Sequence, residues 1–273
     1  MPEGDSIFRT AQALHRALAG SHVSRFESML PALTRIDVDR TLAGRRVESV
    51  TARGKHLLMA FSGDLILHTH MRMTGSWHVY RPGERWRRAA RDMRIIIETT
   101  NAVAVAFNVP VAEFLSTREL ARHTQLRALG PDPLDPSFDC AEVIHRMHEH
   151  DREAIGDVLL NQRVLAGLGN VFKSEVLFVA GIDPFRTIAV LSDDELQRVV
   201  DVAKKLLAAS VMSPSQTLSR AAGRRTTRSL DPTANLWVYG RAGKPCRRCG
   251  TLVRSARTGL DARLTYWCPR CQG

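Results

Sequence analysis

Four cysteines close to the C-terminus constrain this chain more than any other feature of its sequence. They form two C-x-x-C pairs separated by 18 residues, Cys246 with Cys249 and Cys268 with Cys271. This spacing is typical of a zinc ribbon, in which a hairpin brings both pairs to one tetrahedral ion. Two disulfides or unbound thiols are the alternatives. Because four thiolates complete the coordination of Zn²⁺, the sequence predicts one structural zinc ion with no open position for a catalytic water.

The positive charge of the chain is concentrated in its C-terminal fifth. The formal net charge is +11, and residues 220–273 contain 12 Lys and Arg but only 2 Asp and Glu. A basic region of this kind is expected to bind a polyanion, because each neutralised phosphate releases condensed counterions. The arginines alternate with aromatic residues such as Trp237 and Tyr239. This pattern favours an ordered nucleic-acid-binding region over a solvated arginine-rich tail.

The N-terminal sequence predicts the location of the protein. Its first residues include the acidic Glu3 and Asp5, with no basic segment followed by an apolar one, and no stretch of the chain approaches 18 apolar residues. We therefore expect a cytoplasmic, nucleoid-associated protein with no membrane partner. In a reducing compartment paired cysteines bind metal more often than they form disulfides, and the isolated Cys140 is expected to be inert.

Short β-rich segments fill the first half of the chain, after a helix indicated by the apolar period over residues 7–18. Glycine-containing turns between these segments favour antiparallel hairpins packed as a β-sandwich. The expected strands are 47–52, 56–61, 64–70, 77–80, 93–99 and 102–107.

A proline-rich segment, residues 130–136, ends this region, because three prolines in seven residues cannot continue a helix or a central strand. Helical patterns follow over 141–150, 155–160, 172–180 and 193–209. The chain is therefore expected to be an α+β protein. Its predicted domains are an N-terminal β-sandwich (1–130), a helical domain (131–225) and a zinc finger (226–273).

Pro2 directly follows Met1, and removal of that methionine would expose a secondary amine. An α-amine titrates near pH ~8, well below a lysine, so a useful fraction is neutral and can attack a sugar C1′ to form an imine. The neighbouring Glu3 would then transfer protons on the opened sugar. Alone, the Pro-Glu pair is weak evidence, because proline is common at this position.

Five motifs in a fixed order strengthen this interpretation. They are Met1–Gly4, Arg53–Leu58, His70–Trp77, Leu168–Phe172 with Glu175–Phe178, and Tyr239–Arg241. Together with the cysteine pairs they strongly resemble the formamidopyrimidine-DNA glycosylase/endonuclease VIII family of base-excision repair enzymes. The resemblance covers essentially the whole chain.

The resemblance implies a bifunctional DNA glycosylase and abasic-site lyase, in which Pro2 is the Schiff-base nucleophile and Glu3 the general acid/base. It implies that Lys55 contacts a phosphate and assists proton transfer, whereas on its own this lysine would be interpreted as an exposed strand-end charge. It also implies that Arg263 of the ribbon binds the backbone of the extruded nucleotide. The implied fold is a β-sandwich with an N-terminal helix, a helix-two-turn-helix domain and a zinc ribbon.

Further DNA contacts follow from the same resemblance. Gly169 and Asn170 would bind the lesion-side phosphate at a helix N-terminus, where amide donors are available; a plain helix cap is the alternative. Extrusion of a nucleotide leaves a gap in the base stack. Met73, helped by Arg72, is placed where the family fills that gap, and the alternative is a methionine in the core. Tyr239 belongs to the motif before the ribbon and is expected near the DNA.

The chain also departs from the family. Many relatives have a second glutamate where this chain has Ser6, which puts the polarisation of Pro2 in doubt. The formamidopyrimidine branch inserts an Arg and a Phe from a loop that is short here, residues 108–112, and Phe114 is expected in the core. The chain therefore looks closer to the endonuclease VIII branch, whose preferred lesions are oxidised pyrimidines.

The expected partner is damaged double-stranded DNA, with single-stranded or bubble DNA as a further substrate, bound by a monomer. Two alternatives remain at this point: a non-catalytic DNA-damage-binding paralogue, raised by Ser6, and an RNA-associated zinc-ribbon protein. Residues 221–232 occupy the position of the family's lesion-covering loop. His68 and His70 alternate on one strand face, where structural roles are expected unless a third metal ligand lies nearby.

Overall fold

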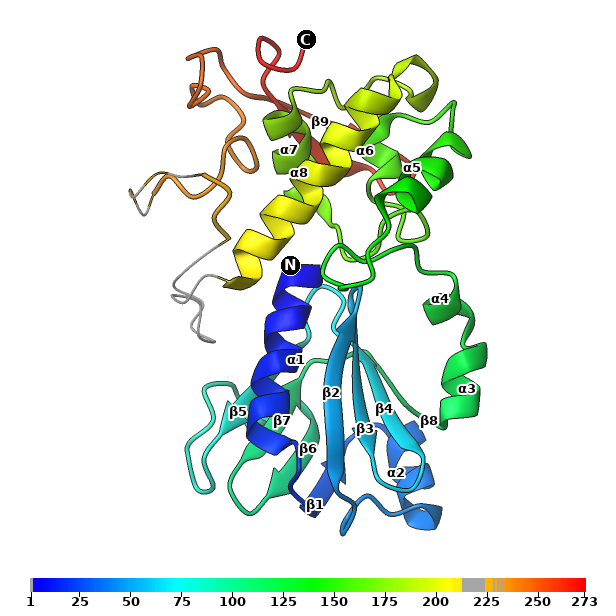
Figure 1. Cartoon of the computed structure of the whole chain (residues 1–273). Helices are drawn as coiled ribbons and strands as arrows, with labels where there is room; N and C mark the ends of the chain where they lie inside the picture. Colours follow the sequence, from blue (N-terminus) through cyan, green and yellow to red (C-terminus); the bar gives the residue numbers. More distant parts are fainter. Residues whose placement is uncertain (1, 213–223, 228, 230, 232) are drawn as a thin grey trace. The chain divides into compact units, whose positions relative to one another are not determined.

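The structure is a computed structural model that describes residues 2–212, 224–227, 229, 231 and 233–273 (Figure 1). The chain divides into two compact units, residues 1–128 and 129–273. Met1 and several residues of the 221–232 segment (221–223, 228, 230 and 232) lie outside the described residues. The proposed further division after residue 225 stays a prediction.

The N-terminal unit contains, within residues 2–128, two four-stranded sheets whose neighbouring strands are all antiparallel. One sheet has the order β1-β6-β7-β5 and the other β2-β3-β4-β8. The strands are β1 Val23–Ser28, β2 Val47–Arg53, β3 His56–Phe61, β4 Leu65–His70, β5 Ser76–Tyr80, β6 Met93–Thr99, β7 Val103–Phe107 and β8 Val111–Leu115. The helices of this unit are α1 Gly4–Leu18, α2 Pro31–Asp39, η1 Ala90–Asp92, α3 Thr117–Arg122 and α4 Thr124–Arg127.

One apolar core joins the two sheets and α1. Side chains of β2, β3 and β4 meet those of β6 and β7, and α1 adds Ile7, Ala11, Leu14 and Leu18 at the spacing of one helix face. The Trp77 indole N–H of one sheet donates to the Thr69 hydroxyl of the other at 3.2 Å. The expected β-sandwich with an N-terminal helix is therefore confirmed.

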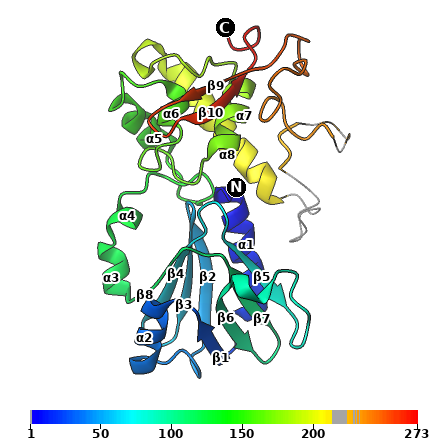
Figure 2. The same cartoon turned by 180° about the vertical axis from the view of Figure 1, so that it is seen from behind.

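The described residues of the C-terminal unit form helices joined by loops, together with a two-stranded antiparallel ribbon. Its elements are α5 Cys140–His148, α6 Ile155–Val158, α7 Asn170–Ala180, η2 Ile188–Val190, α8 Asp193–Met212, β9 Arg254–Thr258 and β10 Arg263–Trp267. Both views show the ribbon lying against α7 (Figures 1 and 2). The expected helical domain with a zinc ribbon is confirmed.

Helix α7 is buried on nearly every side. Its apolar residues, among them Phe172 and Val176, fill the core against α8, as expected for a helix that is apolar around most of its circumference. Three polar residues of α7, Lys173, Ser174 and Glu175, are fully buried as well. Buried polar groups require partners, and those partners come from the ribbon and the segment before it.

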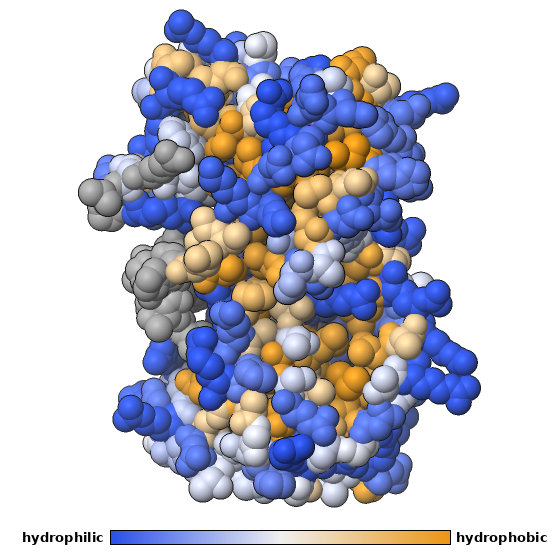
Figure 3. All heavy atoms as spheres, viewed as in Figure 1, coloured by the Kyte–Doolittle hydropathy of each residue, from blue (hydrophilic) through white to orange (hydrophobic). Residues whose placement is uncertain are grey.

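No helix of the described part of the chain is long and apolar enough to cross a membrane. On the face drawn in Figure 3, hydrophilic side chains cover much of the surface, with smaller apolar areas between them.

Candidate active site and nucleic-acid interface

The N-terminal helix places Pro2 at the end of the sandwich where the β2–β3 turn lies. Gly20 N–H, just after α1, donates to the Val47 carbonyl at the start of β2 (2.8 Å), and His15 Nδ1 accepts from Val50 N–H (3.1 Å). From that junction α1 runs back ~22 Å, and β2 covers a similar ~20 Å. Both elements therefore finish at the same end of the unit, as both views show.

The start of α1 is held by a reciprocal cap between Glu3 and Ser6. Glu3 N–H donates to Ser6 Oγ (2.9 Å), and the Ser6 hydroxyl donates to the Glu3 carbonyl (2.8 Å). Glu3 is fully buried, and so is Asp5, which forms an ion pair with Arg9 at 3.5 Å. An acidic residue in the first turn is favourable to the helix dipole. The two hydrogen bonds between Ser6 and Glu3 therefore fix the backbone at the start of α1.

The β2–β3 turn carries Lys55 beside this helix end. Gly54 in the turn has a φ of 59°, in the left-handed region that favours glycine. Lys55 is half-buried, and it is directly followed by His56, the first residue of β3. The structure therefore brings Pro2, Glu3 and Lys55 to one end of the N-terminal unit. Their catalytic roles stay predictions.

The loop between β4 and β5 presents Met73 at the same end of the sheet. Met73 is 58% exposed, which makes the alternative of a core methionine wrong. The loop is tight, because Gly75 N–H donates to the Met71 carbonyl (2.8 Å) and a Cβ on Gly75 would meet that oxygen at 2.7 Å. Arg72 has a φ of 43° and an exposed side chain. Insertion of Met73 into DNA stays a prediction.

The predicted phosphate-binding residues of the C-terminal unit lie next to one another. Gly169 is the N-cap of α7, and Asn170 is its first residue. Asn170 Nδ2 donates to the carbonyl of Leu264 at 2.8 Å, and Leu264 directly follows Arg263 at the start of β10. Arg263 also lies 3.6 Å from Asp261 and keeps 43% of its side chain exposed. The N-terminus of α7 and the exposed guanidinium of Arg263 therefore lie close together, and this arrangement favours binding of an anion.

Two further polar residues of α7 attach the ribbon and its leading segment. Lys173 Nζ donates to Thr265 Oγ1 of β10 at 2.7 Å. Glu175 accepts hydrogen bonds from the backbone N–H groups of residues 237, 238 and 239 at 2.8–2.9 Å, and from the hydroxyl of Thr226. Tyr239, one of the predicted DNA contacts, is therefore positioned through its backbone by Glu175, while its ring lies 5.0 Å from that of Tyr266.

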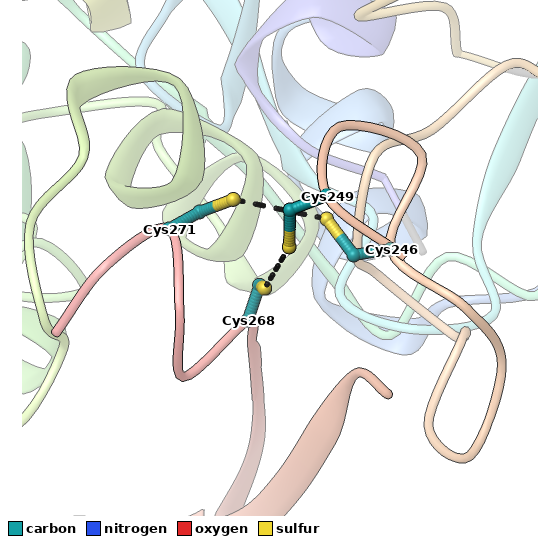
Figure 4. A group of neighbouring side chains, drawn as sticks. All are labelled: Cys246, Cys249, Cys268 and Cys271. Atoms are coloured by element: carbon teal, nitrogen blue, oxygen red, sulfur yellow. Dashed lines mark hydrogen bonds between the residues drawn. The ribbon is translucent and has the colours of Figure 1, made fainter. Parts of the chain in front are cut away.

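The four cysteines of the ribbon lie close together. Their Sγ atoms are all within 4.8 Å of one another, with 3.4 Å between Cys249 and Cys268 and 3.9 Å between Cys246 and Cys271 (Figure 4). Tetrahedral zinc with Zn–S bonds of ~2.3 Å separates its sulfurs by ~3.8 Å, so the cluster fits the ion.

The chemistry of the thiols agrees with this fit. Burial and the neighbouring thiols raise the pKa of Cys271 to about 12. Its thiolate form, which zinc requires, therefore depends on the charge of the ion itself. The prediction of one structural zinc ion held by four cysteines is confirmed.

Sequence reasoning missed a second basic surface, on the N-terminal unit. The loop 81–91, which follows β5 and includes the first two residues of η1, contains five arginines and one glutamate, and nearly all of it is exposed. Its Trp86 packs edge-on against Phe107 at 5.7 Å between ring centroids. The net-charge count concealed this loop, because acidic residues elsewhere in the first 219 residues nearly cancel it. A local window over the run Arg85–Arg88 would have found it.

Other predictions concern residues outside these sites. Phe114 lies in the core of the N-terminal unit, as expected. The loop after β7 contains only residues 108–110 before β8 begins, so it is as short as expected. His68 does have further potential ligands nearby, Glu113 and His123, so a metal site and a hydrogen-bonded structural role have to be compared for this group.

Three family models match the chain. The "Formamidopyrimidine-DNA glycosylase N-terminal domain" matches residues 1–111, the "Formamidopyrimidine-DNA glycosylase H2TH domain" residues 129–221, and the "Zinc finger found in FPG and IleRS" residues 243–273. Fold and sites thus define a protein that combines a β-sandwich, a helix-two-turn-helix motif and a zinc finger. The chain belongs to the formamidopyrimidine-DNA glycosylase family.

Relatives match over the full length. The chain is 43% identical over 277 residues to the "Probable endonuclease 8 2" of Streptomyces coelicolor, with 100% of this chain and 94% of that protein covered. It is 37% identical over 278 residues to the "DNA-(apurinic or apyrimidinic site) lyase Nei2" of Mycolicibacterium smegmatis, with 100% and 99% covered. A solved complex of Lactococcus lactis Fpg with abasic-site DNA has a TM-score of 0.80 at 22% identity, covers 99% of both chains, and shows the same fold.

Proposed function

We propose that this chain excises oxidised pyrimidines from damaged DNA and then cuts the strand at the resulting abasic site. Its class of activity is that of a DNA glycosylase with abasic-site lyase activity, the class to which its family and relatives belong. This full-length family match argues against an RNA-associated zinc-ribbon protein. Relatives named as enzymes argue against the non-catalytic paralogue.

The observation that carries the proposal is the position of Pro2. With Met1 removed, its secondary amine would be the first atom of the chain, directly before the N-cap Glu3 of a helix whose start is fixed by the Glu3–Ser6 hydrogen bonds. Because α1 and β2 end together, Lys55 lies at the same end of this unit. A nucleophile, a buried carboxylate and a cation are the groups that imine chemistry on an abasic sugar needs.

The proposed reaction proceeds in three steps. The Pro2 nitrogen attacks C1′ of the extruded nucleotide, the base leaves with its bonding electrons, and a proton restores its neutrality. Opening of the sugar then gives an iminium ion between Pro2 and C1′. This cation acidifies the C2′ proton, whose removal expels the 3′ phosphate by β-elimination, and a second elimination expels the 5′ phosphate. Glu3 transfers the protons, and Lys55 holds a phosphate near the sugar.

The C-terminal unit would hold the DNA backbone. Asn170, the first residue of α7, and Arg263 lie close enough to bind one phosphate. The zinc ion keeps the ribbon folded and takes no part in the chemistry, because four cysteines fill its coordination sphere. We expect a monomer to bind damaged duplex DNA, with single-stranded or bubble DNA as a further substrate, at the nucleoid.

The proposed preference for oxidised pyrimidines is supported by the short loop of residues 108–110. Three residues between two paired strands cannot carry a side chain far from the sheet, so this loop cannot supply an arginine and a phenylalanine to the gap opposite the lesion. Met73, presented by another loop, remains for that role. An excision assay on thymine glycol, dihydrouracil and 8-oxoguanine duplexes measures the preference, and faster release of 8-oxoguanine would contradict it.

Borohydride trapping on an abasic duplex tests the nucleophile. We compare the mature chain, which begins at Pro2, with the same chain carrying a removable N-terminal extension that turns the Pro2 nitrogen into an amide. The mature chain should form a covalent adduct with DNA, the extended chain should not, and removal of the extension should restore trapping. Equal trapping by the extended chain would exclude Pro2 as the nucleophile.

A further inference from the structure

A group of four histidines and one glutamate lies in and beside the sheet β2-β3-β4-β8, next to the two turns that carry Lys55 and Met73. His56 begins β3 directly after Lys55, and His70 ends β4 three residues before Met73. The two are paired across the strands. The remaining members are His68 on β4, Glu113 on β8 and His123 between α3 and α4. The predicted DNA chemistry uses none of these five residues.

The hydrogen bonds of this group allow only one assignment of donors and acceptors, and both chains of bonds end on Glu113. Leu126 N–H donates to His123 Nδ1 (3.3 Å), so a neutral His123 carries its proton on Nε2 and donates it to Glu113 Oε1 (3.0 Å). The Glu113 carboxylate only accepts, so His68 donates to it from Nδ1 (2.8 Å). His68 Nε2 is then left to accept from His56 Nδ1 (2.8 Å). Each ring is thereby restricted to one tautomer.

The other end of the group supports the Met73 turn. His70 Nδ1 accepts the backbone N–H of Arg72 at 3.1 Å. Arg72 has a left-handed φ of 43°, which costs energy for a residue with a side chain, so this hydrogen bond stabilises a strained turn. The His70 ring also meets the His56 ring edge-on, with 4.7 Å between the centroids.

We propose that Glu113 anchors a directed hydrogen-bond relay through His68 to His56, and that this relay, together with His70, positions the Lys55 hairpin and the Met73 turn for the lyase reaction. The inference rests on the proposed function. All four are positioning residues, since they act on the reaction through the two turns.

The electrostatics agree with neutral rings around one anion. Burial lowers the pKa of His56 to about 3, helped by repulsion from His70, His68 and His123 whenever one of them is protonated, and from Arg53. Burial likewise lowers the pKa of His70 to about 4, helped by His68, Lys55 and Arg72. The titratable groups that act on His56 and His70 are therefore basic, and Glu113 is the acidic member of the group. Burial raises the pKa of Glu113, but hydrogen bonds from His68 and His123 outweigh it and lower the pKa overall.

The same atoms raise the question of a metal ion, since ligand atoms of His68, Glu113 and His123 lie within 4.8 Å of one another. A neutral imidazole has one lone pair, and that of His123 already accepts from Leu126 on Nδ1. The contacts of 2.8 and 3.0 Å fit hydrogen bonds. Ligands around zinc, with bonds of ~2.0–2.1 Å, would lie ~3.3 Å apart. The geometry therefore favours the relay over a second metal site.

Long-range ¹⁵N–¹H spectra of histidine-labelled, zinc-loaded protein test the relay directly. At pH 8, His68 and His56 should carry their protons on Nδ1 and His123 on Nε2. Glu113→Ala should leave His68 in mixed tautomers, whereas Glu113→Gln, which still offers an oxygen, should retain most of the pattern. A proton on Nε2 of His68 in the wild-type protein would overturn the proposal. So would a second zinc ion per chain that Glu113→Ala removes.

Single-turnover cleavage of an abasic duplex measures the positioning effect. Glu113→Ala should lower the maximal rate about tenfold, since a displacement well below 1 Å is expected, while the Kd for the duplex should change less than twofold. Glu98→Ala, on the other sheet with a comparably exposed ion pair to Arg25, is the matched control and should keep the wild-type rate. Should Glu113→Ala fail to fold, His123→Ala removes one of the two hydrogen bonds that hold the Glu113 carboxylate in place, and it should lower the rate in the same direction.

An unchanged rate in a variant with scrambled tautomers would refute the positioning role. The tautomer spectra need no DNA, so they remain decisive if the wild-type protein proves to have no lyase activity. That result would contradict the proposed function alone.

Discussion

Replacing Glu175 by glutamine should loosen the segment that joins the helical domain to the zinc ribbon. Glu175 is fully buried on α7, and its two oxygens accept the N–H groups of Trp237, Val238 and Tyr239. Glutamine keeps the shape but turns one oxygen into a donor. At least one of the three amides then faces another N–H group, and the others lose a charged acceptor.

The magnitude follows from these contacts. A buried donor left unsatisfied costs about 1–3 kcal/mol, and each hydrogen bond that loses its charge costs about 1 kcal/mol. We therefore expect Glu175→Gln to lower the free energy of unfolding of the C-terminal unit by about 4 kcal/mol. At about 2–4 °C per kcal/mol, the Tm of that unit should fall by about 10 °C.

Hydrogen exchange locates the effect. The amides of residues 237–239 should exchange at least about a hundredfold faster in Glu175→Gln, with zinc still bound. Glu142→Gln is the matched control, because Glu142 makes a half-exposed ion pair with Arg146 at 2.7 Å, worth at most ~1 kcal/mol. If the three amides keep their protection, or if the Tm shifts no more than in the control, the carboxylate does not hold this segment.

Four further outcomes are expected. Chelation of zinc should unfold the ribbon and weaken DNA binding at least ~tenfold while the N-terminal unit keeps its circular dichroism; unchanged binding would contradict a structural ion. Asp261→Asn should release Arg263 from its competing anion and tighten abasic-duplex binding ~2–5-fold in titrations, whereas weaker binding would show that the aspartate orients it. Met73→Ala should slow excision from duplex DNA ~tenfold and from single strands little; equal effects would exclude gap filling. The pKa values of His56 and His70 in the folded state lie near 3 and 4, so below pH ~6.5 the unfolded chain binds protons that the folded chain does not. Urea unfolding should therefore show a constant free energy of unfolding of the N-terminal unit above that pH and a decline towards pH 4.

Local patterns in the sequence were sufficient for much of the fold. The apolar period over residues 7–18 predicted α1, and β-rich segments bounded by turn residues, such as 56–61 and 93–99, were predicted with the bounds that the structure has. The cysteine spacing predicted the metal site because its ligands are close in the chain and their chemistry is restrictive. In each case the information is contained within about 25 residues.

Elements without a clean period were missed. β1, Val23–Ser28, is mostly polar and has an irregular register at Val23 and Arg25, so its residues do not alternate between apolar and polar. β8, Val111–Leu115, is short and has only two buried residues. Both strands exist because they pair with β6 and β4, and that pairing is a tertiary interaction that no local window contains.

The site shows the same division. The resemblance predicted roles for Pro2, Lys55 and Asn170, which stay predictions, but it did not indicate that Glu175 holds a segment 62–64 residues away. Nor did it indicate that Glu113 and His123 complete a group with His68. The role of a buried charged residue depends on partners that the fold brings together, and a local sequence pattern does not reveal those partners.

Because α1 and β2 have the same length in space, the number of residues in α1 determines where the Pro2 nitrogen lies. One residue added to or removed from the helix between Gly4 and Gly20 would move its start by ~1.5 Å and turn it by ~100° about the axis. The terminus would then face a different direction, although every contact of the core behind it could be repaired. Under the proposed mechanism, side chains on the outer surface of this helix can therefore change freely, whereas the helix length can hardly change, because it sets where the Pro2 nitrogen lies.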